Sequence, residues 1–203
     1  MNTLKVDPAQ IEKVRKQYIN TSLWIKAQKK LQLEQAEVKT IPKGIFRKKE
    51  DLTVQKTAER LFKEPKSYKT VIGNIIIDAR SIKDSLAHGY GQKKLDVLMS
   101  LKDDFENAIY LSSEKDFYGK EQVNHFFAYP IVYDGKRNLV FCRVIQDVNK
   151  NRLYVYEVFI EKEIKNKSNT LQTAAHISKD NKPHGGIALY LNILDDILSV
   201  NTD

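Results

Sequence analysis

A short strand, a polar segment and a helix are predicted by the stretch Ile75-Ile76-Ile77-Asp78-Ala79-Arg80-Ser81-Ile82-Lys83-Asp84-Ser85-Leu86-Ala87-His88-Gly89-Tyr90-Gly91-Gln92-Lys93-Lys94 and the amphipathic run that follows it to Ile109. The isoleucines are typical of a buried strand. The run after residue 94 has the apolar spacing of a helix. Hydroxyl, imidazole and ammonium groups are thus crowded where two rigid elements meet, and such a junction can hold them in a fixed geometry.

The composition indicates a soluble protein with an anionic partner. The chain has 203 residues, of which 41% are hydrophobic and 30% charged, and 34 Lys and Arg against 26 Asp and Glu give a net charge of +8. An excess of positive charge favours nucleic acid, a membrane surface or an acidic protein as partner. A mildly basic solvated surface is the simpler alternative.

Cys142 is the only cysteine, which excludes an intrachain disulfide and a cysteine-based zinc site. Its apolar surroundings predict a buried side chain. A reducing compartment, the cytoplasm, is expected. The sequence has no apolar leader and no segment that is long and apolar enough to span a bilayer.

Helices precede strands along most of the chain, which predicts an α+β fold with helices packed on a roughly four-stranded antiparallel sheet. We expect a basic helical extension over residues 1–69 and an α+β domain over residues 70–203. The predicted helices are 8–38, with Asp7 as its cap, 51–63, 80–87, 92–108 and 187–200. The predicted strands are 71–77, 123–133, 139–146, 153–160 and 170–177, with a hairpin turn at Asp134-Gly135.

Alternation along these strands predicts which side chains share a face. His125 and Tyr129 are expected on one face of the first strand of the meander. On the third strand, Tyr156 is expected opposite Glu157. Arg143 faces the same way as the apolar residues Leu139, Phe141 and Ile145.

The sequence contains no recognisable motif for binding a metal ion or a nucleotide. The histidines are His88, His125, His176 and His184, and none has the spacing of a helical zinc site. Gly89-Tyr90-Gly91 lacks the ending of a phosphate-binding loop, and no Gly-x-Ser-x-Gly elbow occurs. We therefore expect neither a metal nor a cofactor.

Metal-free acid–base chemistry on a polyanion is what these residues favour. Cleavage of RNA by its own 2′-hydroxyl needs a base, an acid and cations at the phosphate. His88 and His125 would transfer the protons, and Lys94 and Arg143 would stabilise the phosphate. A structural role for each histidine is the open alternative.

Aromatic residues on the strands give a second indication of nucleic acid. Tyr129, Tyr154 and Tyr156 lie in predicted strands, and rings on a sheet can stack on exposed bases. The alternative is that tyrosine is a favourable strand residue whose ring faces the core.

Residues 71–198 resemble a group of phage and polymorphic-toxin domains, the large polyvalent-protein-associated and MuF-linked domains of the barnase–EndoU–colicin–RelE-like nuclease group. The resemblance is carried by the segments Ser85-Leu86-Ala87-His88-Gly89, Lys93-Lys94, His125-Phe126-Phe127-Ala128-Tyr129-Pro130 and Asn151-Arg152-Leu153-Tyr154-Val155-Tyr156-Glu157. It implies helices on a four-stranded antiparallel sheet and a metal-independent ribonuclease, often acting on tRNA.

The resemblance also implies site residues and partners. Ser85 and His88 match the helix motif, Lys93 or Lys94 the basic position and His125 the strand histidine. Ser85 would orient a histidine or a phosphate oxygen. The expected substrate-binding residues are Lys93, Tyr129, Tyr156 and His176. RNA, tRNA first, is the expected partner of a bacterial or phage protein that is delivered into a target cell, with an immunity or antitoxin protein as a second partner.

Two other functions fit the same residues. One is a non-enzymatic phage accessory module that binds nucleic acid or a protein. The other is an enzyme that transfers a group to a nucleotide or a protein. If His88 and His125 converge beside a cation in an open cleft, the ribonuclease is favoured. If one of them is buried or the two lie apart, the binding module is favoured.

Overall fold

The computed structural model describes residues 7–11, 21–87, 91–115, 121–147, 149, 152–160, 193 and 195–200. The chain forms two compact units, residues 1–37 with 161–203 and residues 38–160. The predicted strand 170–177, His88, His176 and half of the predicted last helix (residues 187–192 and 194) lie outside the described residues. Residues 38–69 of the predicted extension supply two strands and a helix of the second unit.

The first unit contains α2 (Thr21–Gln35), and residues 8–11 and 195–198 are also helical. As predicted, Asp7 caps the first helical turn, because its Oδ1 accepts a hydrogen bond from the Ala9 N–H at 2.9 Å. A small apolar cluster joins Trp24, Ala27, Leu31 and Val200.

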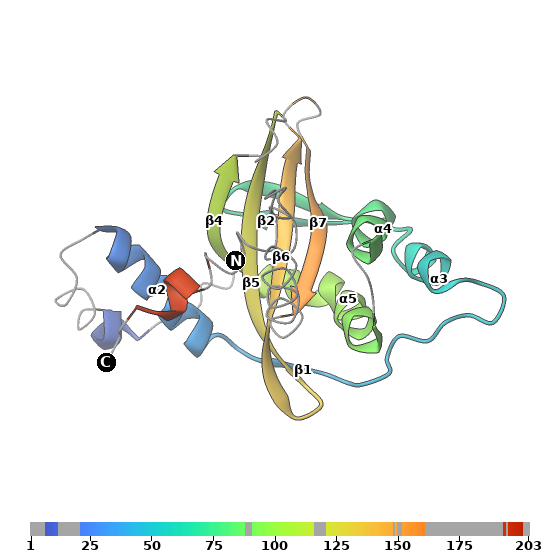
Figure 1. Cartoon of the computed structure of the whole chain (residues 1–203), viewed down its shortest axis with the longest axis horizontal. Coiled ribbons are helices and arrows are strands. Elements are labelled where there is room, and N and C mark those ends of the chain that lie inside the picture. The colour runs from blue at the N-terminus through green and yellow to red at the C-terminus, as the bar shows by residue number, and fades with distance from the viewer. Residues whose placement is uncertain are drawn as a thin grey trace, which may run out of the picture. The chain divides into compact units, whose positions relative to one another are not determined.

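One mixed sheet of seven strands forms the centre of the second unit (Figure 1). The strands are β1 (Lys39–Ile41), β2 (Lys66–Thr70), β3 (Gly73–Ile77), β4 (Ile109–Lys115), β5 (Gln122–Tyr133), β6 (Lys136–Asp147) and β7 (Arg152–Ile160). Their order is β1-β5-β6-β7-β3-β2, and β4 pairs with β5. The predicted four-stranded antiparallel sheet is therefore wrong, since the sheet is larger and the β1–β5 and β3–β7 pairs are parallel.

Two short strands share one edge of β5. β4 pairs with the first half of β5 and β1 with its last three residues, where Lys39 lies opposite Ile131. Pro130 lies between these two paired stretches. Proline has no N–H to donate to a neighbouring strand, so this position suits a change of partner.

The central meander β5–β6–β7 confirms the three strands predicted from alternation. Its first turn is the predicted Asp134-Gly135, whose φ angles of 53° and 68° are those of a type I′ turn. The turn places Tyr133 opposite Lys136 and so sets the register of the whole hairpin.

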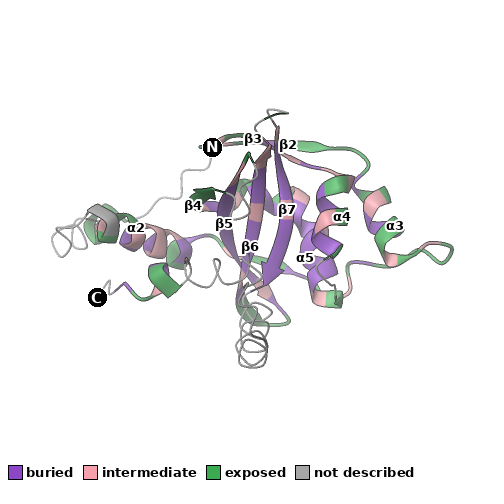
Figure 2. Cartoon of the chain, turned by 45° about the horizontal axis from the view of Figure 1, so that its top comes forward, coloured by how far each residue is buried: buried purple, intermediate pink, exposed green. Residues whose placement is uncertain are grey.

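Three α-helices and one short 3-10 helix complete the described part of the unit: α3 (Val54–Leu61), α4 (Ala79–Ala87), α5 (Gln92–Asp104) and the 3-10 helix Phe105–Asn107. Figure 1 shows α4 beside β7 and α3 beside α4. α5 supplies Leu95, Leu98 and Leu101 to the core, together with Val140, Cys142 and Val144 of β6. Figure 2 shows that the buried residues concentrate in the central strands and on the inner sides of α4 and α5. Cys142 is fully buried, as predicted.

A bulge changes the side-chain alternation of β7. Arg143 of β6 lies opposite Glu157, but the next residue, Val144, lies opposite Val155, so Tyr156 is an extra residue. Leu153 and Val155 before the bulge, and Val158 and Ile160 after it, all belong to the core. The prediction that Glu157 faces away from Tyr156 is therefore wrong, because a bulge sets two successive residues against one partner.

Candidate nucleic-acid interface

Ser85 and Lys94 meet at a buried point between α4, α5 and β7. β3 pairs with β7 only at Leu153 and Tyr154, so the edge of β7 beyond them needs another partner. Ser85 Oγ supplies it by accepting a hydrogen bond from the Val158 N–H at 3.0 Å. Lys94 Nζ donates to the Ser85 carbonyl oxygen at 2.8 Å. Both side chains are almost fully buried, at 0% and 2% exposure.

His125 lies on the core face of β5 and is only 6% exposed. Its Nε2 is hydrogen-bonded to Gln146 Oε1 at 3.1 Å, and the Tyr110 ring lies 6.4 Å away between centroids. Burial lowers the pKa of His125, although the bond to Gln146 opposes the shift. The imidazole is therefore mainly neutral at physiological pH.

The structure does not bring His125 and Ser85 together. Ser85 contacts the outer edge of β7, whereas His125 lies on β5, with β6 between the two strands. At the usual spacing between strands, β5 and β7 are about 10 Å apart, and Ser85 lies beyond β7.

Arg143 lies on the opposite face of the sheet from His125. His125 is opposite Val144 in the β5–β6 pair, and Arg143 is opposite Phe126. Directly paired residues share a face and successive residues alternate. The predicted use of Arg143 and His125 on one phosphate therefore does not fit this register.

The bulge gives Arg143 two partners of its own. Its NH1 lies 3.9 Å from Glu157 Oε2, and its guanidinium carbon lies 4.4 Å from the Tyr156 ring centroid. Glu157 is only 4% exposed. Arg143 thus already has a carboxylate and an aromatic ring, the two kinds of group that a guanidinium binds best.

The two remaining predicted binding residues in the described part of the chain have different surroundings. Tyr129 is 2% exposed, and burial raises the pKa of its hydroxyl. Its ring is part of the core, so it offers no surface for stacking in this conformation. Lys93 is partly exposed, and its Nζ donates to Asn138 Oδ1 at 2.8 Å and lies 5.6 Å from the Tyr133 ring centroid.

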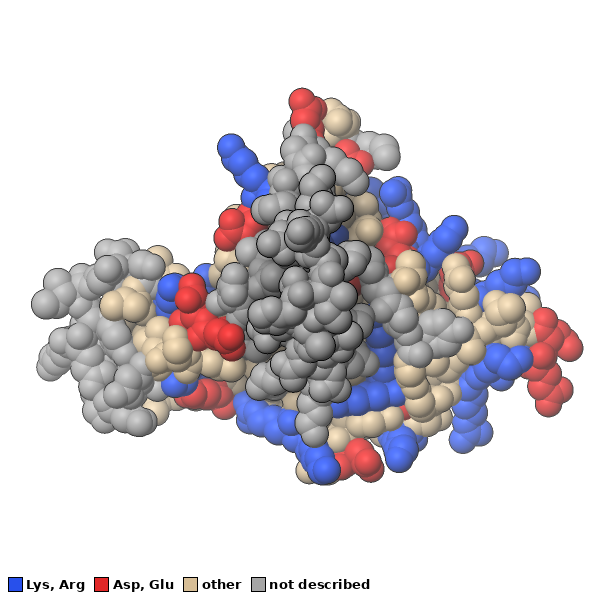
Figure 3. Space-filling model, in the orientation of Figure 1, with Lys and Arg blue, Asp and Glu red and all other residues tan. Residues whose placement is uncertain are grey.

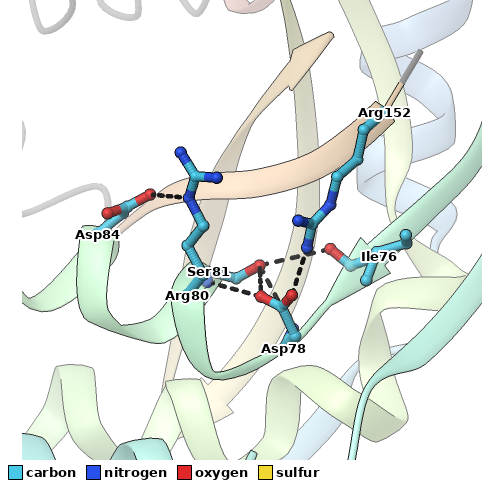
Figure 4. Close-up of polar contacts among 6 residues, drawn as sticks. All are labelled: Ile76, Asp78, Arg80, Ser81, Asp84 and Arg152. Carbon is cyan, nitrogen blue, oxygen red and sulfur yellow. Dashed lines mark hydrogen bonds and ion pairs between the residues drawn. The ribbon is translucent and has the colours of Figure 1, made fainter. Parts of the chain in front are cut away.

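A polar cluster that sequence reasoning missed joins the start of α4 to β7 (Figure 4). Asp78 Oδ1 accepts a hydrogen bond from the Ser81 N–H at 3.0 Å, and Asp78 Oδ2 forms an ion pair with Arg152. Burial alone would raise the pKa of Asp78, but the bond from Ser81 and the charge of Arg152 outweigh it and lower that pKa. The Asp-x-x-Ser spacing before a helix was the available signal.

A second ion pair completes this cluster. Arg80 Nε lies 3.8 Å from Asp84 Oδ2. The guanidinium carbons of Arg80 and Arg152 lie 5.0 and 5.4 Å from the ring centroid of Tyr154. Each arginine has a carboxylate partner, so the cluster fastens α4 to β7 without providing a net positive field.

Asp96 of α5 is the second feature that the sequence did not reveal. It is fully buried and accepts four hydrogen bonds. The donors are the Gly44 N–H (2.8 Å), the Phe46 N–H (2.8 Å), Gln92 Nε2 (2.9 Å) and the Tyr133 hydroxyl (2.8 Å). The carboxylate therefore joins the segment after β1, the first turn of α5 and the end of β5.

Five basic residues surround the region that Asp96 holds together, and we call them the basic end: Lys43, Arg47, Lys93, Lys136 and Arg137. All but Lys93 are exposed. The carboxylate of Asp134 lies 3.9 Å from Lys43, and these two side chains are about two-thirds exposed, at 67% and 66%. In Figure 3, Lys and Arg side chains gather along the lower edge of the view, where Figure 1 places β1 and the β5–β6 turn.

The described residues contain no group of three His, Cys, Asp or Glu side chains that could hold a metal ion. Within that same part of the chain, no helix is long and apolar enough to cross a membrane.

Comparison with models of known protein families identifies the family of this chain. The family model described as large polyvalent protein-associated domain 3 matches residues 48–154, more than half of the chain. The chain belongs to this family. The large polyvalent protein-associated domain 3 match covers α3, α4, α5 and β2 to β6 and ends within β7. It agrees with the polyvalent-protein part of the resemblance seen in the sequence. No curated protein and no solved structure matches the chain.

Proposed function

We propose that residues 38–160 form a binding module that contacts nucleic-acid phosphates through the basic end. The observation that carries this proposal is the buried Asp96 carboxylate, which joins the three segments that bear these lysines and arginines: the segment after β1, the start of α5 and the end of β5. Cations that are fixed before binding lose less conformational freedom on contact with a phosphate. Phosphate contacts of this kind supply most non-specific affinity for nucleic acid.

The contacts that the predicted catalytic residues make within the fold favour a binding function over catalysis. Ser85 Oγ caps the edge of β7, and His125 is buried and hydrogen-bonded to Gln146. Arg143 lies on the other face of the sheet, beside Glu157. A group that transfers a proton must be within reach of the substrate, so the burial of His125 favours a structural role for it.

A metal-independent ribonuclease centred on His88 is the second candidate. The observation in its favour is the direct hydrogen bond between Lys94 and the Ser85 carbonyl oxygen, which joins two of the three residues that the sequence groups with His88. RNA, with tRNA first, would then be the substrate, in the cytoplasm of a bacterium, and an immunity protein would be the natural inhibitor.

Binding is tested by fluorescence anisotropy with labelled duplex DNA, single-stranded DNA and tRNA over a range of salt concentrations. The variant Lys43→Glu/Lys136→Glu/Arg137→Glu reverses three charges of the basic end. Its matched control, Lys56→Glu/Lys69→Glu/Lys115→Glu, reverses three exposed lysines on other elements. We expect only the first variant to lower the slope of log affinity against log salt, by about 2 to 3, since each lost phosphate contact removes nearly one unit.

Equal losses in both variants would contradict a localised interface, and an absence of binding by the wild type would refute the proposal. The same samples, incubated with tRNA and a chelator beside a His88→Ala variant, test the second candidate. Chelator-resistant cleavage that His88→Ala abolishes would establish the ribonuclease.

A further inference from the structure

The segment Lys43-Gly44-Ile45-Phe46-Arg47 is clamped on both sides of Ile45. The N–H groups of Gly44 and Phe46 donate to the two oxygens of the same buried carboxylate, Asp96, at 2.8 Å each. The Phe46 carbonyl oxygen accepts a hydrogen bond from Gln92 Nε2 at 3.1 Å. Gly44 has a φ of +77°, a backbone conformation that favours glycine.

The clamp separates two neighbouring apolar side chains. Phe46 enters the core and is 5% exposed, whereas Ile45 is 37% exposed. Lys43 and Arg47 flank Ile45 and are exposed. The basic end therefore presents one rigidly held aliphatic side chain among its cations.

We propose that Ile45 inserts between base pairs in the minor groove of duplex DNA, while the cations of the basic end contact the phosphates on either side. This inference rests on the proposed nucleic-acid binding and specifies its partner. Aliphatic side chains that enter the minor groove partly unstack a base step and kink the duplex, and basic residues around them hold the bent backbone.

The burial of the aromatic residues beside the basic end favours duplex over single-stranded nucleic acid as the partner. Non-specific binding of single strands uses exposed rings on which bases stack. Two aromatic residues are hydrogen-bonded to Asp96 in the clamp, Phe46 and Tyr133, and they are only 5% and 6% exposed. The basic end therefore offers a wedge but no stacking surface in its described part.

The clamp also explains how one aliphatic side chain could deform DNA. Unstacking a base step costs free energy. If the inserted side chain were flexible, the loss of its conformational freedom on binding would add to that cost. Because Asp96 fixes the backbone on both sides of Ile45, the wedge is ordered before DNA arrives.

The test compares Ile45→Ala with Val71→Ala, its matched control. Val71 is another exposed aliphatic residue, at 74% exposure, in the turn between β2 and β3. A duplex with a donor and an acceptor dye at its ends reports bending by energy transfer. A duplex with 2-aminopurine at successive positions reports unstacking by its fluorescence.

We expect wild type and Val71→Ala to bend the duplex and to raise 2-aminopurine fluorescence at one step. Ile45→Ala should lose both signals and bind about 3- to 10-fold more weakly, in the range of a lost aliphatic contact. Its salt slope should stay unchanged, because no cation is removed.

Bending and fluorescence that persist in Ile45→Ala would overturn this inference and leave phosphate binding intact. Binding of single strands without binding of duplex, or of anionic phosphatidylserine vesicles without either, would also overturn it. Failure of the wild type to bind any nucleic acid would refute the proposed function and this inference together.

Discussion

Replacing Asp96 by Asn tests whether one carboxylate organises the basic end. Asn keeps one acceptor oxygen and places an NH2 group where the second oxygen accepts bonds from the Gly44 N–H and the Tyr133 hydroxyl. The hydroxyl can turn and accept, but the Gly44 N–H then loses its acceptor. An unsatisfied buried donor costs about 1–3 kcal/mol, and the remaining bonds lose the assistance of the charge, so we expect a loss of about 2–4 kcal/mol in the free energy of unfolding.

Two measurements check this expectation. Urea denaturation followed by far-ultraviolet circular dichroism gives the change in stability. Hydrogen exchange on peptides covering residues 42–49 reports the Gly44 and Phe46 amides directly, and these should lose protection. Asp103→Asn is the control, because this carboxylate on the same helix is 71% exposed and lies 3.7 Å from Lys66. Its effect should stay within about 0.5 kcal/mol. An Asp96→Asn protein as stable as this control, with full protection at residues 42–49, would refute the reasoning.

Three further predictions follow from the buried polar groups. Ser85→Ala leaves the Val158 N–H without its acceptor and should lower the free energy of unfolding, measured in urea, by about 1–3 kcal/mol. Ser113→Ala, at an exposed position, is the control and should be neutral. Equal effects of the two substitutions would contradict the edge-capping role of Ser85. Burial lowers the pKa of His125, so the unfolded chain binds this proton more readily and stability should fall as the pH decreases through about 6.5. His125→Gln should flatten this part of the pH profile in thermal melts between pH 7.5 and 5.5, and an unchanged profile would argue against the shift. Lys39 Nζ lies 2.5 Å from the buried Asp104 carboxylate, and the lysine side chain is half-exposed. Lys39→Met should lower the free energy of unfolding by about 1–3 kcal/mol, because it leaves that carboxylate unpaired. The double variant Lys39→Met/Asp104→Leu should recover part of this loss, since it removes the unpaired carboxylate.

The sequence predicts well those elements whose signals are local. The Asp134-Gly135 turn follows from its own chemistry, and α5 and the three long strands follow from their periodicity. β1, β2 and β4 were not predicted, because they are edge strands that are defined by pairing with a neighbour and not by a local sequence pattern. β1 exists through a parallel contact with residues more than 90 positions later in the chain. At β4, the apolar Ile109 also fitted the end of the preceding helix.

The separation of His125 from Arg143 could have been predicted from sequence. A two-residue turn at 134–135 makes Tyr133 and Lys136 partners, and counting back along the hairpin pairs Phe126 with Arg143. The role of Asp96 could not, since nothing local links a carboxylate in a helix to backbone groups about 50 residues earlier. The bulge at Tyr156 also left no clear local signal, because Tyr154, Tyr156 and Glu157 all fit an ordinary strand.

The bulge in β7 decides how this strand tolerates changes of length. Deleting Tyr156 would give an uninterrupted strand in which Val155 and Val158 still face the core, because the extra residue is the one removed. Deleting a single residue of the strand outside residues 155–157 would transfer part of the apolar series to the other face, unless the bulge itself moved. Natural variation in the length of this strand should therefore be confined to residues 155–157. Relatives that lack the extra residue should also lack the ring that Arg143 contacts.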